Sequence, residues 1–307
     1  MSDLQTNTIH TGDCFDVLPT LPDESVHMVM TSPPYWNLRD YDHADQLGLE
    51  PESDQYVQNM ADVFDEVKRV LRPDGSLLLN LGDTYENKDL QQIPARVALE
   101  LQQRGWILRN RVTWAKPNPM PQSVKDRLND TTEAVFHFVK NRKYWYDLDA
   151  IREEYSEVSK SQIESNHKRK TTHKWGDSPG NHEDGGLHDP DKKLSDMYHS
   201  DGKNPGDVFE VSVKSFPEAH FAVYPPELCE KPIKASCPKE GVVLDPFAGA
   251  GTTLLKSKEL GRQFVGIELN PKYADMARAR VGIDVDDPSN VRNDADQSGL
   301  EAYKVSK

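Results

Sequence analysis

Short apolar runs alternate along the chain with amphipathic stretches, and the first clear run stops abruptly. Residues 25–30, SVHMVM, are short, apolar and partly β-branched, which predicts a buried strand. The next residues, TSPPYW at 31–36, end that run with two prolines and two aromatic residues. From 53 to 71 apolar side chains recur every three or four positions, which predicts a helix with one buried face that Pro73 and Gly75 stop.

The alternation continues beyond this helix. Further strands are predicted at 75–83, 106–114, 132–139, 241–245 and 263–268, and further helices at 93–105, 225–237, 252–261 and 271–282. Strands that alternate with helices are typical of a parallel sheet covered on both faces. We therefore predict an α/β fold with a doubly wound, mostly parallel sheet.

The alternation fails between residues 141 and 207, where the chain is charged, rich in histidine and interrupted by glycine and proline. We predict an inserted region at 141–207 between two parts of one core, 1–140 and 208–283. The segment 284–307 is acidic and has almost no apolar periodicity, so it is predicted to be a mostly disordered tail.

Charge and cysteine content narrow the function classes. The chain of 307 residues has 51 acidic and 37 basic residues, a net charge of -14, which ordinarily argues against a nucleic-acid partner. Because the acid is spread along the whole chain, it suits a surface that stays solvated in concentrated salt; an acidic patch for a basic partner is the alternative. The three cysteines form no C-x-x-C pair and the histidines have no matched cysteines, so neither a disulfide framework nor a metal site is predicted.

No stretch approaches the ~20 apolar residues that a membrane helix needs. The start, MSDLQTNTIH, also lacks the basic and then apolar pattern of a signal peptide. We therefore expect a cytoplasmic protein without a membrane partner.

The sequence DPFAGAGTT at 245–253 joins a predicted strand to a predicted helix, a place where backbone N–H groups bind ligands. A phosphate loop would need a lysine that is absent here, and a dinucleotide fingerprint would need a third glycine where Leu254 stands. The remaining interpretation is a loop that binds a cofactor with an adenosine and no phosphate. Glu268 ends the next strand, 23 residues after Asp245, where an acid can accept both hydrogen bonds of a ribose diol; an exposed acid at a strand end is the alternative.

The prolines of TSPPYW donate no hydrogen bonds and fix a rigid, extended turn. With the Ser32 hydroxyl, such a turn presents hydrogen-bond acceptors at the carboxyl end of a strand, where doubly wound sheets bind ligands. Acceptors are what an exocyclic amino group of a base needs to become nucleophilic. Tyr35 offers a flat face on which a base can stack. The alternative is a proline turn whose aromatic residues pack into the core.

Taken together, TSPPYW and DPFAGAGTT resemble the catalytic and cofactor motifs of the S-adenosylmethionine-dependent amino-methyltransferases of DNA. Catalytic motif first and cofactor motif late is the circularly permuted order of that family's β group. The resemblance also covers LRPDGSLLLNLGD, WAKPNPMP and HFAVYPPELCEKPI. It implies a Rossmann-like class I methyltransferase fold, with a catalytic half at 1–140, a target-recognition insert at 141–207 and a cofactor-binding half at 208–283.

The resemblance also assigns residues. Ser32 and the Pro33 carbonyl would hold the target amino group in the turn that Pro34 completes, and Tyr35 would stack on the base. S-adenosyl-L-methionine would be bound by Asp245, Phe247, Gly249, Gly251 and Thr252 around the methionine and sugar, by Glu268 at the ribose and by Asp13 at the adenine. For Asp13, a turn residue that caps the segment after Gly12 is an equal alternative.

A serine at the first position of this motif is typical of N4-cytosine enzymes in that family. We therefore expect direct methyl transfer from S-adenosyl-L-methionine to N4 of a cytosine flipped out of duplex DNA. An N6-adenine methyltransferase is the main alternative, and a catalytically silent nucleic-acid-binding protein is another. A C5-cytosine enzyme would need a cysteine after a proline, whereas Cys237-Pro238 has the reverse order.

The segment HKRKTTHKW at 167–175 has four basic residues and no acidic residue. A solvated loop is the alternative, but we expect phosphate contacts from Lys168, Arg169, Lys170 and Lys174. The other expected partner is a cognate restriction endonuclease that acts separately. Resemblance to enzymes of salt-adapted microbes suggests a short palindrome such as CTAG as the recognition sequence.

Overall fold

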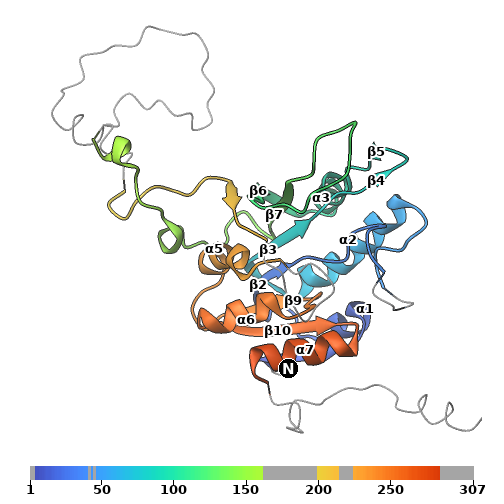
Figure 1. The fold of residues 1–307 in the computed structure, drawn as a ribbon. Helices are drawn as coiled ribbons and strands as arrows, with labels where there is room; N and C mark the ends of the chain where they lie inside the picture. The colour runs from blue at the N-terminus through green and yellow to red at the C-terminus, as the bar shows by residue number, and fades with distance from the viewer. Residues whose placement is uncertain (1–3, 41–42, 44–45, 162–198, 214–223, 284–307) are drawn as a thin grey trace, which may run out of the picture. The chain divides into compact units, whose positions relative to one another are not determined.

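The computed structural model describes residues 4–40, 43, 46–161, 199–213 and 224–283 (Figure 1). The chain divides into two compact units, one of residues 1–147 and 207–307 and one of residues 148–206. The four basic residues predicted to contact DNA, Lys168, Arg169, Lys170 and Lys174, lie outside the described residues, as does the segment 284–307. Within the described ranges, no helix has the length and apolar character needed to cross a lipid bilayer.

The first unit is built on one eight-stranded sheet in the order β1-β10-β9-β2-β3-β7-β6-β8. Its strands are β1 (Thr8–Thr11), β2 (Val26–Thr31), β3 (Leu71–Leu81), β6 (Ile107–Ala115), β7 (Thr132–Val139), β8 (Val208–Glu210), β9 (Val242–Asp245) and β10 (Gln263–Glu268). Neighbours are parallel from β1 to β3, whereas β7 is antiparallel to both β3 and β6. The predicted α/β fold with a mostly parallel sheet is confirmed.

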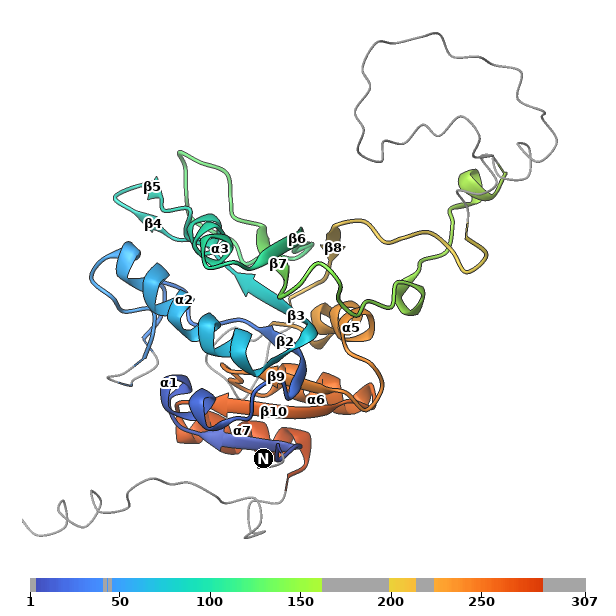
Figure 2. The same cartoon turned by 180° about the vertical axis from the view of Figure 1, so that it is seen from behind.

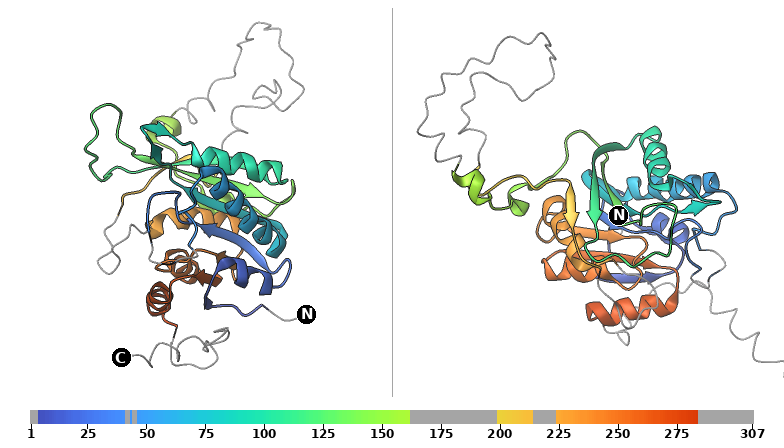
Figure 3. Two further views of the ribbon diagram at one scale, coloured as in Figure 1. Left: turned by 90° about the vertical axis from the view of Figure 1, so that its right-hand side faces the viewer. Right: turned by 45° about the horizontal axis from the view of Figure 1, so that its top comes forward.

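Helices cover both faces of this sheet (Figure 3). On one face lie α1 (Cys14–Val17), α2 (Ser53–Val70) and α3 (Ile93–Gln103), and on the other lie α5 (Pro226–Ser236), α6 (Thr252–Glu259) and α7 (Pro271–Val281). The alternation of β3 shows why: Leu77 and Leu79 pack into the α2 side of the core, and Leu78 packs into the α5 side. Smaller elements are β4 (Tyr85–Glu86), β5 (Asp89–Leu90) and the 3-10 turns Leu18–Thr20 and Asp149–Ile151.

Elements begin and end largely where the sequence predicted, with instructive exceptions. Helix α2 ends at Val70, and β3 follows it directly from Leu71 instead of starting at residue 75, so Pro73 lies inside the strand. A Cβ on Gly75 would come within 2.7 Å of the Leu71 side chain, so the strand needs glycine there. The short strands β1 and β8 were not predicted, because four and three residues leave too little periodicity to recognise.

The centre of the sheet brings the two sequence motifs together. Strand β2 lies beside β9, with Met28 opposite Val243 and Val29 opposite Leu244, although the two strands are far apart in the sequence (Figure 2). The chain leaves β2 toward α2 on one face and leaves β9 toward α6 on the other face. Such a divergence opens a crevice at the carboxyl ends of the strands, where doubly wound sheets bind ligands.

Candidate active site

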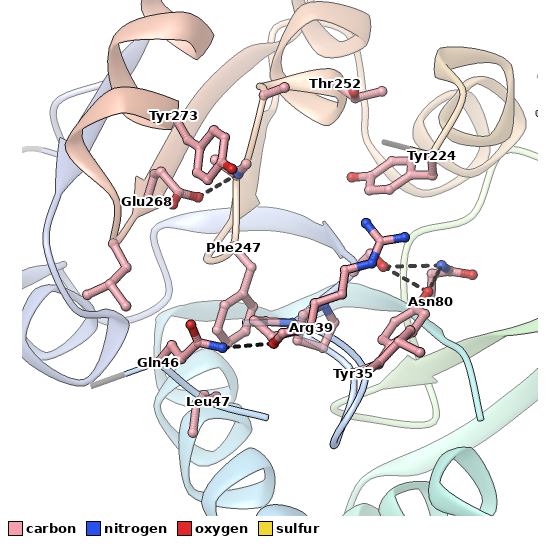
Figure 4. Close-up of a pocket in the computed structure, with 18 of the residues that line it drawn as sticks. Tyr35, Arg39, Gln46, Leu47, Asn80, Tyr224, Phe247, Thr252, Glu268 and Tyr273 are labelled. Atoms are coloured by element: carbon pink, nitrogen blue, oxygen red, sulfur yellow. Dashed lines mark hydrogen bonds between the residues drawn. The ribbon is translucent and has the colours of Figure 1, made fainter. Parts of the chain in front are cut away.

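A cavity of about 380 Å³ lies at the carboxyl ends of β2, β3, β9 and β10. Its wall includes every residue predicted for catalysis and all those predicted for the cofactor except Asp245 and Gly251, namely Asp13, Ser32, Pro33, Pro34, Tyr35, Phe247, Gly249, Thr252 and Glu268. Figure 4 shows Tyr35 and Asn80 on one side of the cavity, Glu268 and Tyr273 on the opposite side, and Phe247 between them. The sequence therefore predicted residues that the fold does bring together.

The turn after β2 is held from several sides. The Tyr56 hydroxyl of α2 donates to the Pro34 carbonyl at 2.8 Å, so this carbonyl faces helix α2 and is not one of the acceptors that the turn was predicted to present to a ligand. The buried Trp36 indole donates to the Glu50 carbonyl at 2.9 Å. One side of the Tyr35 ring lies against Gly82, directly after β3. The Ser-Pro-Pro-Tyr turn is therefore rigid before any ligand binds.

Asp245 connects this turn to the glycine loop. Its side chain is 1% exposed, and its Oδ1 accepts from the Thr31 hydroxyl at 2.6 Å and from the Phe247 amide at 3.1 Å. Its Oδ2 accepts from the Tyr224 hydroxyl at 3.2 Å. Burial raises the pKa of the Asp245 carboxyl, and these hydrogen bonds oppose that rise. Asp245 thus fixes the relative position of the two loops.

The glycine loop turns twice through left-handed backbone conformations. Gly249 has φ of 51° and Gly251 has φ of 75°, both in the region that favours glycine. A Cβ on Gly251 would lie 3.0 Å from the Cβ of Ala277 in α7, so the loop also needs the close approach. Thr252 begins α6, is 2% exposed and accepts a hydrogen bond from Arg280 at 2.9 Å.

Glu268 lies at the end of β10, as predicted, and it contacts this loop. Its Oε2 accepts from the Gly249 amide at 2.7 Å and its Oε1 accepts from the Asn270 amide at 2.9 Å. Burial is the main reason that the pKa of Glu268 is raised above its usual value. The exposed strand-end alternative is wrong, because this carboxyl lines the cavity and is largely buried.

Asp13 caps helix α1: its Oδ1 accepts from the Phe15 amide at 2.9 Å. This confirms the capping role that the sequence left open. Asp13 also lines the cavity, where it could reach a cofactor. Its contact with the adenine of a cofactor stays a prediction.

Several cavity residues were not predicted from the sequence, among them four polar ones that contact the predicted residues or one another, namely Asn80, Lys116, Glu133 and Tyr224. Asn80 is 1% exposed, and its amide nitrogen lies 3.2 Å from Ser32 Oγ, 2.8 Å from the Tyr35 hydroxyl and 2.8 Å from Glu133 Oε2. Asn80 could have been predicted as a functional residue, because it is the one polar residue within the apolar run LLLNL. Glu133 and Lys116 carried no such signal, because their role depends on the antiparallel placement of β7.

The cavity is suited to a cationic adenosine cofactor. Carboxylates (Asp13, Glu268), an aromatic ring (Phe247) and a left-handed glycine loop line one side of it. The loop contains no lysine for a phosphate. A buried carboxyl next to a ligand carrying a sulfonium and an ammonium group gains a charge partner that offsets its desolvation. The residues present therefore fit S-adenosylmethionine.

Comparison with known proteins agrees with this geometry. The profile of the DNA methylase family matches residues 26–279. Type II methyltransferase M.XycI of Xanthomonas campestris pv. cyanopsidis is 38% identical, over 91% of this chain and 88% of that protein. Type II methyltransferase M.Cfr9I of Citrobacter freundii is 36% identical, over 91% and 89%.

Solved structures show the same fold. The cytosine-N4-specific PvuII DNA methyltransferase superposes with a TM-score of 0.65 at 20% identity, over 97% of this chain and 91% of that chain. A putative DNA modification methylase of Thermus thermophilus, complexed with S-adenosyl-L-methionine, gives 0.55 at 23% identity, over 89% and 94%. The catalytic turn, the cofactor cavity and these relatives lead to one conclusion: the chain belongs to the DNA methylase family and is an S-adenosylmethionine-dependent DNA methyltransferase of the restriction–modification type.

Proposed function

We propose that this enzyme methylates the exocyclic N4 of a cytosine flipped out of duplex DNA. The observation that carries the proposal is the position of Ser32: it lines the same cavity as Glu268 and follows Thr31, which is hydrogen-bonded to Asp245 beside the glycine loop. A hydroxyl and a carbonyl can both accept hydrogen bonds from an amino group, which pyramidalises that nitrogen and makes it nucleophilic. The cofactor, when bound, supplies an electrophilic methyl group on its sulfonium sulfur.

In this proposal the chain itself binds and orients. Ser32 Oγ and the Pro33 carbonyl accept from the amino group, and Tyr35, backed by Gly82, borders the base. Pro34 acts indirectly, because its carbonyl is held by Tyr56 and so fixes the turn. The cofactor would be held by Asp13, Asp245, Phe247, Gly249, Gly251, Thr252 and Glu268, with Asp245 and Thr252 contributing mainly through the shape of the loop. A base inside a duplex cannot enter this cavity, so flipping is required.

Support for cytosine comes from the serine at the first position of the motif and from the similarity to the cytosine-N4-specific PvuII enzyme. The family contains enzymes of both specificities, so an N6-adenine methyltransferase is the second candidate. Lys168, Arg169, Lys170 and Lys174 are proposed phosphate contacts of a recognition insert at 141–207. We further propose that the enzyme acts in the cytoplasm and that a restriction endonuclease of the same site accompanies it.

The test is product identification. The purified enzyme is incubated in concentrated potassium chloride with methyl-labelled S-adenosylmethionine and duplex DNA of mixed sequence, and the DNA is then digested to nucleosides. Label in N4-methylcytosine is the expected result. Label in N6-methyladenine would overturn the base assignment while leaving the amino-transfer chemistry in place. A Ser32→Ala variant serves as the matched control, since it should retain cofactor binding and lose methyl transfer.

A further inference from the structure

One carboxylate at the edge of the cavity receives hydrogen bonds from three directions. Glu133, near the start of β7, accepts from the Tyr35 hydroxyl at 2.6 Å and from the Asn80 amide at 2.8 Å, both on Oε2. Its other oxygen, Oε1, forms an ion pair with Lys116. The ammonium group of Lys116 also lies 4.6 Å from the centre of the Trp114 ring. The side chains of both ion-pair partners are less than a fifth exposed, at 19% for Lys116 and 14% for Glu133.

The direction of each hydrogen bond follows from counting protons. A phenol has one proton, and the ionised carboxylate of Glu133 can only accept, so Tyr35 donates to Glu133. The Tyr35 oxygen is then an acceptor toward its other neighbours. Ser32 Oγ lies 3.2 Å from it, and so Ser32 donates its single proton to Tyr35. Burial and the Glu133 charge raise the pKa of Tyr35 well above its usual value, which keeps the phenol proton in place.

The chain therefore runs in one direction, from Ser32 through Tyr35 to Glu133. Because its proton is committed to Tyr35, Ser32 Oγ presents lone pairs toward its remaining neighbours. The Asn80 amide nitrogen has only two protons, and its two contacts at 2.8 Å, with Tyr35 and Glu133, use both. Its longer contact with Ser32 Oγ, at 3.2 Å, therefore leaves the lone pairs of Ser32 available to a ligand in the cavity. An amino group of a base brings donors only, so a serine that offered its own proton would repel it.

We propose that Glu133 is a positioning residue for methyl transfer: through Tyr35 it sets the hydrogen-bond direction that makes Ser32 an acceptor for the target amino group. This inference rests on the proposed function of the Ser32 site, but it holds for an amino group of either cytosine or adenine. It gives Tyr35 a second role besides bordering the base, and it explains why a carboxylate from β7 contacts the turn after β2.

Glu133→Gln tests the direction of the chain. The single amide oxygen goes to Lys116, whose ammonium group needs an acceptor, and the NH2 group then faces Tyr35. Tyr35 can no longer donate to residue 133, so its proton turns toward Ser32 and the proton of Ser32 turns toward the base. We expect the single-turnover rate of methyl transfer to fall about 10- to 100-fold. The dissociation constants for S-adenosylmethionine and for DNA should change less than about twofold.

A second substitution separates this reversal from a structural defect. In the double variant K116M/E133Q, the amide oxygen is released from Lys116 and can turn to accept from Tyr35 again. We expect at least half of the lost rate, on a logarithmic scale, to return. Tyr35→Phe, which interrupts the chain, should lower the rate as much as E133Q does, and combining the two should cost no more than either alone.

The control is Glu100→Gln, which weakens another partly buried ion pair, with Arg104 at 3.0 Å and 19% exposure of the glutamate side chain, away from the cavity. Its rate should equal that of the unmodified enzyme. E133Q with an unchanged rate, or a double variant as slow as E133Q, would overturn the inference. Because every rate is measured on whichever base the unmodified enzyme methylates, an error in the proposed base does not affect the outcome.

Discussion

Gly82, the residue after β3, determines where the Tyr35 ring can lie. A Cβ at this position would be 2.8 Å from Cδ2 of Tyr35 and closer still to Cε2. The ring has little room to move, because its hydroxyl is bound by Glu133 and Asn80. We predict that Gly82→Ala displaces Tyr35 and reduces the methyl-transfer rate at least about tenfold, while overpacking lowers stability by roughly 1–3 kcal/mol.

Rapid-quench measurement of the rate together with urea unfolding checks this prediction. Gly206→Ala is the matched control, since a Cβ there would meet nothing within 4 Å. A Gly82→Ala enzyme as fast as Gly206→Ala would show that the ring position is unimportant.

In the proposed cofactor site, the two buried carboxyls Asp245 and Glu268 should make cofactor affinity depend on pH. Burial raises the pKa of both groups, so each holds its proton to a higher pH than a solvent-exposed carboxyl would. A cationic cofactor favours the ionised forms, and its binding therefore releases protons. We predict that the affinity for S-adenosylmethionine falls as the pH decreases through these raised pKa values.

Isothermal titration calorimetry in two buffers of different ionisation enthalpy measures both the affinity and the proton release. Glu268→Gln should bind the cofactor more weakly at neutral pH and should show a smaller pH dependence. An affinity independent of pH across the acidic range would contradict this prediction.

At the scale of elements, the loop between β6 and β7 is fastened at its base. Asn118 donates through Nδ2 to the Val213 carbonyl at 2.9 Å and accepts through Oδ1 from the Val213 amide at 2.8 Å. The Lys116 amide also donates to the Thr131 carbonyl at 2.9 Å, which closes the loop across β6 and β7. The two bonds of Asn118 copy a backbone pair between strands, so one side chain joins this loop to the segment that follows β8.

Asn118→Ala should release this loop without affecting the glycine loop. Residues of the β6–β7 loop, including Pro119 and Met120, line the cavity in which the base would be held. We therefore predict weaker DNA binding, by about 1–2 kcal/mol, with unchanged affinity for S-adenosylmethionine. Fluorescence anisotropy with labelled duplex DNA measures the first quantity and calorimetry the second. Equal losses of both affinities would indicate general destabilisation.

Strands β3 and β7 also carry a buried, hydrogen-bonded pair of polar side chains, Ser76 and His137. His137 is 4% exposed, and its Nε2 lies 3.1 Å from Ser76 Oγ. Burial, and secondarily the charge of Arg109, lower the pKa of His137 from 6.5 to about 4. Because the unfolded chain binds this proton more readily, the histidine's contribution to stability is complete above pH 6.5 and is lost as the pH falls toward 4.

We predict that His137→Gln, which keeps a hydrogen-bonding side chain but does not titrate, is less sensitive to acid than the unmodified enzyme. The free energy of unfolding of the unmodified enzyme should fall by about 2 kcal/mol more than that of the variant between about pH 7 and pH 5. Asp83, Asp245 and Glu268 have raised pKa values and act in the opposite direction, so only the difference between the two proteins is informative. Urea unfolding at both pH values measures it, and parallel curves would contradict the prediction.

The same elements show how far sequence reasoning reaches. The apolar periodicity predicted α2, β7 and β10 with nearly correct bounds, because each buries a long enough stripe to be recognised. The motifs predicted the residues at the ends of β2 and β9, because glycine and proline have local conformational meaning. Glu133 and Lys116 could not be predicted, since their contact with Tyr35 depends on which strand lies beside β3, and sheet order is not a local property of the sequence.

At the scale of the whole molecule, much of the positive charge of the described residues is already paired within the chain. Arg104 contacts Asp62 at 2.6 Å, Asp65 at 2.7 Å and Glu100 at 3.0 Å, and these contacts raise its pKa. Arg69 likewise contacts Asp23 at 2.5 Å and Glu66 at 2.9 Å. Arginines that are neutralised by neighbouring acids contribute little to phosphate binding. The negative field that the net charge of -14 produces therefore repels DNA, and these arginines do not offset it.

Salt therefore has two opposite effects on DNA binding by this enzyme. The DNA affinity falls by about one power of the salt concentration for each phosphate contact that the protein makes. Salt also screens the repulsion between the acidic surface and DNA, which raises the affinity. If the surface is adapted to concentrated salt, the second effect dominates, and we predict that DNA affinity stays constant or rises between dilute and molar potassium chloride. Anisotropy titrations across this range, with cofactor affinity measured in the same buffers to confirm that the enzyme remains folded, test the prediction. A loss of DNA affinity at moderate salt with the cofactor still bound would contradict salt adaptation and leave the acidic surface available for a basic partner.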